Sequence, residues 1–307
     1  MEAPDAGNDR RPLANQGILS LRDGRNLGFA VYGSEDSPPV LFFHGAPGGR
    51  LLPPVAGPLA EKLGIRIISF DRPGFGLSDF KPGRTVPDLA DDVAELADQL
   101  ELERFALLGI SAGGPYLLAC CAAMPERVVR AGTVCGLTPW DRAGIVTNSS
   151  PFPQPVRWAV RRSRAAARAL HAGLVLGMRK SPERGLEGLA STLSTTDRKL
   201  VDRPEIAQFL RRSTLETARG GARGWVYDDW VLNHPWGFDP ADVSPDVEIV
   251  LWAGSDDNVV PVPHVERLAR ELHGARVHVY EGEGHMGVIF DHTEEIFREV
   301  VAGARTG

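Results

Sequence analysis

The chain has 307 residues, of which 43% are hydrophobic and 24% are charged, a balance typical of a globular protein with a sizeable core. Its formal net charge of −6 argues against nucleic acid as a partner. Its three cysteines, Cys120, Cys121 and Cys135, show neither zinc-ligand nor disulfide spacing, which favours core packing in a reduced, cytoplasmic protein.

The N-terminal part of the chain is predicted to alternate short strands with glycine-rich turns. Residues 1–17 are polar and contain no apolar signal-peptide core, so we expect a disordered tail there. Residues 18–21 and 27–32 predict a β-hairpin, because an Asp-Gly pair lies between the two runs. Apolar runs over residues 40–43 and 65–70 each predict a buried strand that ends in a glycine-rich turn.

The next segment predicts a helix over residues 86–100, a strand over 105–108, a sharp turn and a helix over 116–124. Residues 105–124 carry no charge, but a serine, several glycines and a proline interrupt them. We therefore expect a buried strand–turn–helix rather than a membrane span. A further strand is predicted over residues 128–134. Apolar strands that alternate with helices predict a parallel sheet buried on both faces.

The pattern changes between residues 138 and 237, where no strand is predicted. Arginine, alanine, leucine and tryptophan recur there at helical spacing, and prolines divide the segment into pieces. Strands resume at residues 247–252 and 277–280. We therefore predict an α/β core over residues 18–137 and 238–307, interrupted by a helical cap over residues 138–237.

A serine with glycines two residues before and two residues after it stands between the strand at 105–108 and the following helix. A Gly-x-Ser-x-Gly turn in this context forms a nucleophile elbow, in which the glycines allow a sharp turn and the serine is held in a strained conformation. The hydroxyl of Ser111 would then lie at a helix N-terminus, whose dipole favours developing negative charge. An ordinary Gly/Ser turn is the alternative, and the strand-then-helix context argues against it.

A serine hydroxyl becomes a strong nucleophile only when a base takes its proton. Among the eight histidines, His285 follows the last strand in a glycine-rich loop, whereas His44 lies in a tight turn and is expected to be structural. The base needs a carboxylate to fix its tautomer, and the loop after residues 247–252 offers Asp256 and Asp257. No histidine pair shows convincing metal-ligand spacing, so neither a metal nor a cofactor is expected.

An oxyanion that forms at a substrate carbonyl needs preorganised N–H donors. The amide of Ala112, directly after the serine, is one candidate. The loop over residues 44–49 supplies the other, which we expect to be the amide of Ala46, because Pro47 has no N–H to donate.

Five motifs follow one another in the order HGAPGG (residues 44–49), DRPGFGLSD (71–79), GISAGG (109–114), GSDDNVVP (254–261) and GEGH (282–285). Together they resemble the α/β-hydrolase fold, in its capped branch of esterases, epoxide hydrolases and C–C hydrolases. The resemblance implies a mostly parallel sheet of eight strands flanked by helices, with an inserted helical cap. In this family the acid lies three residues after the glycine and four before the proline, and both counts select Asp257.

The resemblance also separates branches of the family. Epoxide hydrolases and haloalkane dehalogenases carry an aspartate at the elbow, where this chain has Ser111. Proline iminopeptidases carry an HGGPG segment close to HGAPGG, but a bulky residue usually follows their serine, and here Ala112 follows it.

The most aromatic stretch of the predicted cap, over residues 225–236, is a candidate wall of the substrate pocket. Within it we take Trp225, Asp229 and Trp230 as candidate substrate-binding residues, together with Met286 beside the predicted base. Burial of the aromatic side chains in a core is the alternative.

The sequence therefore predicts a serine hydrolase with the triad Ser111, Asp257 and His285, acting on a small carboxylic ester or related acyl compound through an acyl-enzyme. One alternative keeps this site but not hydrolysis, as in a lyase, a cyclase or a cofactor-free perhydrolase. A non-catalytic ligand-binding protein is the other, because a fold does not determine a function. Neither the substrate nor the oligomeric state follows from the sequence.

Overall fold

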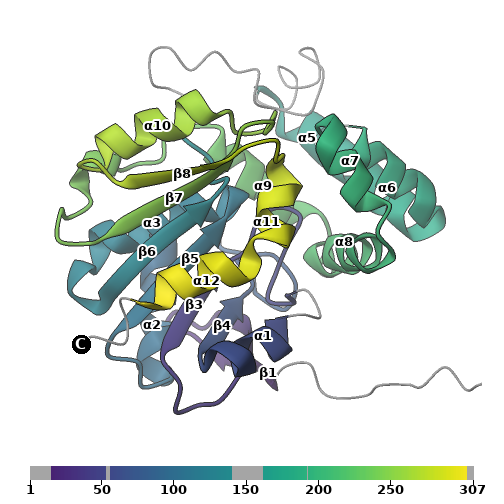
Figure 1. The fold of residues 1–307 in the computed structure, drawn as a ribbon. Helices are drawn as coiled ribbons and strands as arrows, with labels where there is room; N and C mark the ends of the chain where they lie inside the picture. The colour runs from purple at the N-terminus through teal and green to yellow at the C-terminus, as the bar shows by residue number, and fades with distance from the viewer. Residues whose placement is uncertain (1–14, 53–55, 140–161, 192, 303–307) are drawn as a thin grey trace, which may run out of the picture.

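The computed structural model of the protein describes residues 15–52, 56–139, 162–191 and 193–302 (Figure 1). Its centre is an eight-stranded sheet in the order β1-β2-β4-β3-β5-β6-β7-β8. The pairs β1–β2 and β2–β4 are antiparallel, and all other neighbours are parallel, which confirms the predicted mostly parallel sheet. The strands are β1 (Asn15–Ser20), β2 (Asn26–Tyr32), β3 (Pro39–Phe43), β4 (Arg66–Phe70), β5 (Phe105–Ile110), β6 (Val128–Val134), β7 (Ile249–Gly254) and β8 (Arg276–Tyr280).

The first strand begins earlier than its hydrophobic pattern predicts. Asn15 pairs with Val31 and Gly17 with Phe29, so residues 15–17, expected to be disordered, belong to β1. Backbone hydrogen bonds to β2 hold them there, although their side chains are too polar or too small to give a strand signal. The rest of the predicted tail, residues 1–14, lies outside the described residues.

Helices cover both faces of the sheet (Figure 1). Alternate residues of β3 point to opposite faces, so that Leu41 joins one core cluster and Phe42 the other. The first cluster packs beneath α2 (Asp88–Gln99), α3 (Gly114–Ala123) and α10 (Val262–Glu271), and the second beneath α1 (Ala56–Leu63) and α12 (Thr293–Ala302). In the described ranges, no helix is long and apolar enough to cross a membrane.

Between β6 and β7 the described chain is helical and contains no strand. We call the helices of this segment the cap helices. They lie beside one end of the sheet (Figure 1) and comprise α5 (Arg164–Lys180), α6 (Pro182–Ala190), α7 (Thr195–Val201), α8 (Pro204–Thr217) and α9 (Arg223–Leu232).

A buried ionic cluster joins the cap helices to the core. Asp228 of α9 is fully buried and accepts hydrogen bonds from Arg72 Nη2 at 2.9 Å, Arg84 Nη2 at 2.7 Å and the Tyr116 hydroxyl at 2.6 Å. Burial opposes ionisation of Asp228, but the two guanidinium groups outweigh it and hold its pKa at about 2. The carboxylate therefore stays charged, and removing it would leave two cations buried without their partner.

We expect Asp228→Asn to lower the free energy of unfolding by about 3–5 kcal/mol at neutral pH, because the amide cannot neutralise Arg72 and Arg84. The loss should shrink as the pH falls from the ordinary aspartate value of 3.8 toward about 2, where the native carboxylate itself becomes protonated. Urea denaturation at several pH values measures this difference. The exposed Asp246→Asn control should change stability by less than about 0.5 kcal/mol, and equal losses in both variants would contradict the role of the cluster.

Candidate active site

The turn that carries Ser111 is as sharp as the sequence predicts. Ser111 follows β5 directly and has a positive φ of 49°, a conformation that side-chain-bearing residues rarely adopt. A Cβ on Gly113 would lie 2.2 Å from the carbonyl oxygen of Phe43, and one on Gly109 would lie 3.3 Å from the backbone of Gly113. A side chain at Gly113 would therefore overlap the end of β3, and one at Gly109 would be tightly packed against the turn.

His285 and Asp257 meet through a direct hydrogen bond. His285 Nδ1 lies 2.8 Å from Asp257 Oδ2, and both residues are buried. Since a carboxylate can only accept, Nδ1 carries the proton and Nε2 keeps its lone pair, which is the tautomer that a general base requires. The other oxygen of Asp257 accepts from the backbone N–H groups of Val259 at 2.7 Å and Val260 at 2.8 Å. Asp256, by contrast, is exposed.

The electrostatics of this pair favour a charged histidine. Burial alone would lower the pKa of His285, but the Asp257 carboxylate outweighs burial and raises it. Burial likewise opposes ionisation of Asp257. The positive charge of His285 and the hydrogen bonds that Asp257 accepts outweigh burial and lower the pKa of Asp257. The pair can therefore stabilise an imidazolium that forms when His285 takes a proton.

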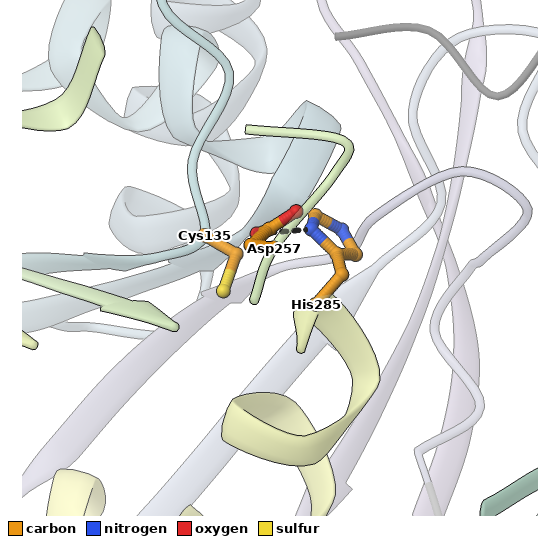
Figure 2. A group of neighbouring side chains, drawn as sticks. All are labelled: Cys135, Asp257 and His285. Carbon is orange, nitrogen blue, oxygen red and sulfur yellow. Dashed lines mark hydrogen bonds and ion pairs between the residues drawn. The ribbon is translucent and has the colours of Figure 1, made fainter. Parts of the chain in front are cut away.

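A cysteine that the sequence assigned to core packing lies against the acid of this pair. Figure 2 shows Cys135, at the end of β6, beside Asp257 and His285, and ligand atoms of the three side chains lie within 4.8 Å of one another. Burial and the neighbouring Asp257, to which the thiol donates a hydrogen bond, raise the pKa of Cys135. A neutral thiol is a poor metal ligand, and Nδ1 of His285 is already engaged, so the bonding fits a thiol donor to the carboxylate better than a metal site.

Ser111 and His285 line the same cavity, which has a volume of about 210 Å³. Ala46 and the rest of the loop over residues 44–49 form another part of its wall, while Ala112 follows Ser111 and is buried. None of the described lining residues is an aspartate, glutamate, lysine or arginine. Much of the wall is apolar and comes from the core and the cap helices alike, including Phe42, Leu59, Val134, Phe209, Leu210 and Phe297.

The loop over residues 44–49 is fixed by hydrogen bonds that the sequence did not reveal. His44 Nδ1 lies 2.7 Å from the carbonyl oxygen of Gly45, and its Nε2 accepts from the backbone N–H of Arg72. The guanidinium of Arg72 also donates to the carbonyl oxygens of His44 and Gly45. Burial and the positive charge of Arg72 hold the pKa of His44 well below its usual range. His44 is thus neutral and structural, as its place in the turn suggests.

The candidate substrate-binding residues separate into two groups. Met286 lines the cavity beside His285. Trp225 instead packs edge-on against His171, Asp229 forms an ion pair with His171 at 2.9 Å, and Trp230 stacks on His234, all away from the described cavity wall. Aromatic side chains in this stretch pack the cap helices together, which is the alternative that the sequence left open.

No functional signal in the sequence marks Asp197, which contacts the residues that follow His285. Asp197 belongs to α7, is fully buried and accepts the backbone N–H groups of Met286 and Gly287. Its only local signature is a helix-capping pattern, since Ser194 accepts the N–H of Asp197 at 3.2 Å. A contact between residues about 90 positions apart leaves no recognisable pattern in a single sequence, so this one could not be predicted.

Comparisons with known proteins place these features in a family. A family model described as alpha/beta hydrolase fold matches residues 38–292. The chain is 26% identical over 295 residues to a non-heme chloroperoxidase of Streptomyces lividans, covering 93% of this chain and 98% of that protein. It is 23% identical over 303 residues to a bifunctional esterase/perhydrolase of Acinetobacter calcoaceticus, covering 94% of this chain and 100% of that protein.

Solved structures show the same architecture. An esterase from Exiguobacterium antarcticum superposes with a TM-score of 0.67 at 22% identity, covering 94% of this chain and 99% of that chain. A thermophilic esterase from Thermogutta terrifontis gives a TM-score of 0.67 at 21% identity, covering 94% and 98% of the two chains. At these identities the likeness concerns the fold.

We expect Gly113→Ala to destabilise the protein by about 3 kcal/mol, the upper end for overpacking, because the new methyl would meet the backbone of Phe43. Gly173→Ala is a matched control, since Gly173 lies in α5 with no atom within 4 Å of an added Cβ. That change should stabilise the protein by up to about 1 kcal/mol through helix propensity. Urea denaturation of both variants measures the difference, and similar values would contradict the close approach at the elbow.

Proposed function

The chain belongs to the alpha/beta hydrolase fold family, and on that basis we propose that it is a serine hydrolase that cleaves small carboxylic esters. The observation that carries the proposal is the convergence of Ser111 and His285 on one cavity, with Asp257 holding the histidine in the tautomer of a base. A relative matched over nearly its full length, whose name includes esterase, supports it.

The proposed reaction proceeds in two steps. Ser111 Oγ attacks the ester carbonyl while His285 Nε2 takes its proton, and a tetrahedral oxyanion forms. The C–O bond to the alcohol then breaks, His285 protonates the leaving alcohol, and an acyl-serine remains. Water, deprotonated by His285, attacks this acyl-enzyme and releases the carboxylic acid and free Ser111. Asp257 stays ionised throughout and stabilises the imidazolium.

Two backbone amides are proposed to hold the oxyanion. Ala112 lies at the turn from the elbow into α3, and Ala46 lies in a loop that lines the same cavity as Ser111. A Cβ on Gly45 would lie 3.4 Å from the Cβ of Ser111, so this loop runs alongside the nucleophile. Preorganised N–H donors of this kind contribute roughly 10²–10³ in kcat each.

The cavity wall supports an apolar, uncharged substrate group. A charged group buried there would have no ionised partner among the described lining residues. The volume of about 210 Å³ is smaller than the roughly 300–1,000 Å³ typical of drug-sized ligand sites. We therefore propose esters with a short to medium apolar acyl or alcohol group as substrates.

Perhydrolysis is a second candidate, favoured by the name of the bifunctional esterase/perhydrolase, which this chain matches nearly end to end. In that reaction hydrogen peroxide replaces water in the second step, so the acyl-serine is converted into a peroxycarboxylic acid and free serine. The same triad would serve both reactions. The two reactions are compared by measuring the rate of peracid formation from an ester and hydrogen peroxide and the rate of acid release from the same ester in water.

A fluorophosphonate probe should label the folded protein covalently at Ser111, and Ser111→Ala should abolish both labelling and ester hydrolysis. Ser213→Ala is the control, because Ser213 is another serine of the cavity wall and should not be the labelled residue. Peptide mapping by mass spectrometry locates the label. Absence of labelling on the folded wild-type protein would reject the proposed mechanism.

A hexanoate ester should be cleaved with a kcat/KM at least about 100-fold higher than the corresponding monoester of adipate, whose acyl chain has the same length but ends in a carboxylate. The expected ratio corresponds to about 3 kcal/mol for burying an unpaired charge. Steady-state kinetics on the same leaving group measures it. Equal kcat/KM values would place the acyl chain outside the apolar cavity.

A further inference from the structure

The cap helices reach the catalytic histidine through one buried carboxylate. Asp197 Oδ1 accepts the backbone N–H of Met286 at 2.9 Å and that of Gly287 at 3.1 Å. These amides belong to the first turn of α11 (His285–Asp291), the helix whose first residue is the histidine itself. The sequence predicts a loop at this point, so the helical start of His285 and its tie to α7 are both new features of the structure.

We propose that Asp197 is a positioning residue that fixes the turn carrying His285 and supplies a second negative charge toward the imidazolium formed during catalysis. The inference rests on the proposed role of His285 as the base. It assigns to the cap helices a part in the chemistry as well as in the cavity wall.

The packing around Asp197 leaves it little freedom. A Cβ on Gly284 would lie 2.4 Å from Asp197 Oδ1, so the residue before His285 can approach this closely only as glycine. On its own helix, the backbone N–H of Asp197 is held by the Ser194 side chain at the start of α7. The Asp197 carboxylate is therefore fixed between α7 and the first turn of α11, and this contact restricts the orientation of the turn that carries His285.

One oxygen of Asp197 has no partner in the described structure. Oδ2 is buried and accepts no hydrogen bond there, while Oδ1 accepts two. Burial raises the pKa of Asp197, and the two N–H donors and the charge of His285 only partly offset it. A buried carboxylate with an unpaired oxygen is stabilised when a positive charge forms nearby. The negative charge of Asp197 correspondingly contributes to the raised pKa of His285.

The charged groups that surround His285 are few. Asp257 approaches from the loop after β7, Asp197 from α7, and Cys135 after β6 is neutral because its pKa is raised. His44, another residue of the cavity wall, is neutral as well. Glu283 beside the turn is half-buried and pairs with His292.

The helices packed against α7 add no competing buried charge. Every ionisable side chain of α6 is exposed, as are Arg198 and Lys199 of α7 itself. In α8, Glu216 is half-buried and pairs with Arg50, and its other charged residues are exposed. Removal of the Asp197 charge should therefore act on His285 without rearranging a second ion pair.

The test compares Asp197→Asn, which keeps an oxygen acceptor for the two amides but removes the charge, with Asp197→Ala, which removes both. A negative charge stabilises the imidazolium, so its loss should lower the pKa of His285. Because the base works in its neutral form, the acid limb of kcat/KM against pH should move to lower pH by about 0.5–1 unit in Asp197→Asn. We expect kcat at the optimum to fall about 10-fold in this variant, and further in Asp197→Ala.

Asp202→Asn, at the exposed C-terminal end of the same helix, is the matched control and should keep the wild-type pH profile. A folded Asp197→Asn protein with lower activity but an unshifted acid limb would overturn the electrostatic part of the proposal. Unchanged kcat in Asp197→Ala would overturn the positioning part.

An NMR titration of the His285 imidazole gives a readout that does not depend on turnover. Its pKa should be lower in Asp197→Asn than in the wild type and unchanged in Asp202→Asn. If the wild-type protein neither hydrolyses esters nor reacts with a fluorophosphonate, the proposed function fails, but the titration still decides whether Asp197 acts on His285. If the pKa of His285 is the same in the wild type and in Asp197→Asn, Asp197 does not act electrostatically on His285, even if the protein is an active esterase.

Discussion

The buried contact between Asp228 and Arg72 is the interaction on which the site depends most. Arg72 lies in the turn after β4, and Asp228 lies in α9, so the pair joins the core to the cap helices without exposure to water. The same guanidinium donates to the carbonyl oxygens of His44 and Gly45. A loop that is proposed to bind an oxyanion is thus held by a cation whose own charge is balanced from the cap helices. Replacing such a pair with apolar groups can be neutral for stability, but removing one partner is costly.

Two carboxylates of the cap helices thereby support the two halves of the site. Asp228 binds Arg72, which donates to the loop beside Ser111, and Asp197 accepts the backbone N–H of Met286, the residue after His285. Neither is one of the aromatic residues that make the segment conspicuous in the sequence. Because Asp197 lies in α7 and Asp228 in α9, both contacts depend on how these two cap helices pack against the core. The cap helices would then organise the site as well as cover it.

The sequence was sufficient for the parts of the site that are encoded locally. The spacing of Gly109, Ser111 and Gly113 predicts a strained turn, and the structure shows why glycine is needed: a Cβ at Gly113 would overlap the backbone of Phe43, and one at Gly109 would make a tight contact. The strands could also be predicted from the sequence, because their apolar runs pair within one continuous sheet. The cap helices are different, because Trp225 and Phe209 have comparable apolar character, yet only Phe209 lines the cavity. Which helix face meets the core depends on long-range packing, and a single sequence carries no periodic signal for it.

Hydrogen bonding, rather than residue type, divides the roles of the two histidines in the cavity wall. His44 uses both ring nitrogens on the backbone, and the adjacent Arg72 keeps it neutral, so it has no lone pair left for a substrate proton. His285 uses only Nδ1, on a carboxylate, and keeps Nε2 available in a setting that raises its pKa. The neighbouring thiol of Cys135 is held protonated by burial and is thus a poor competing nucleophile. Of the two histidines in the described cavity wall, His285 is therefore the one suited to the proposed role of base for Ser111, because its partner is a carboxylate, whereas both ring nitrogens of His44 are bonded to the backbone.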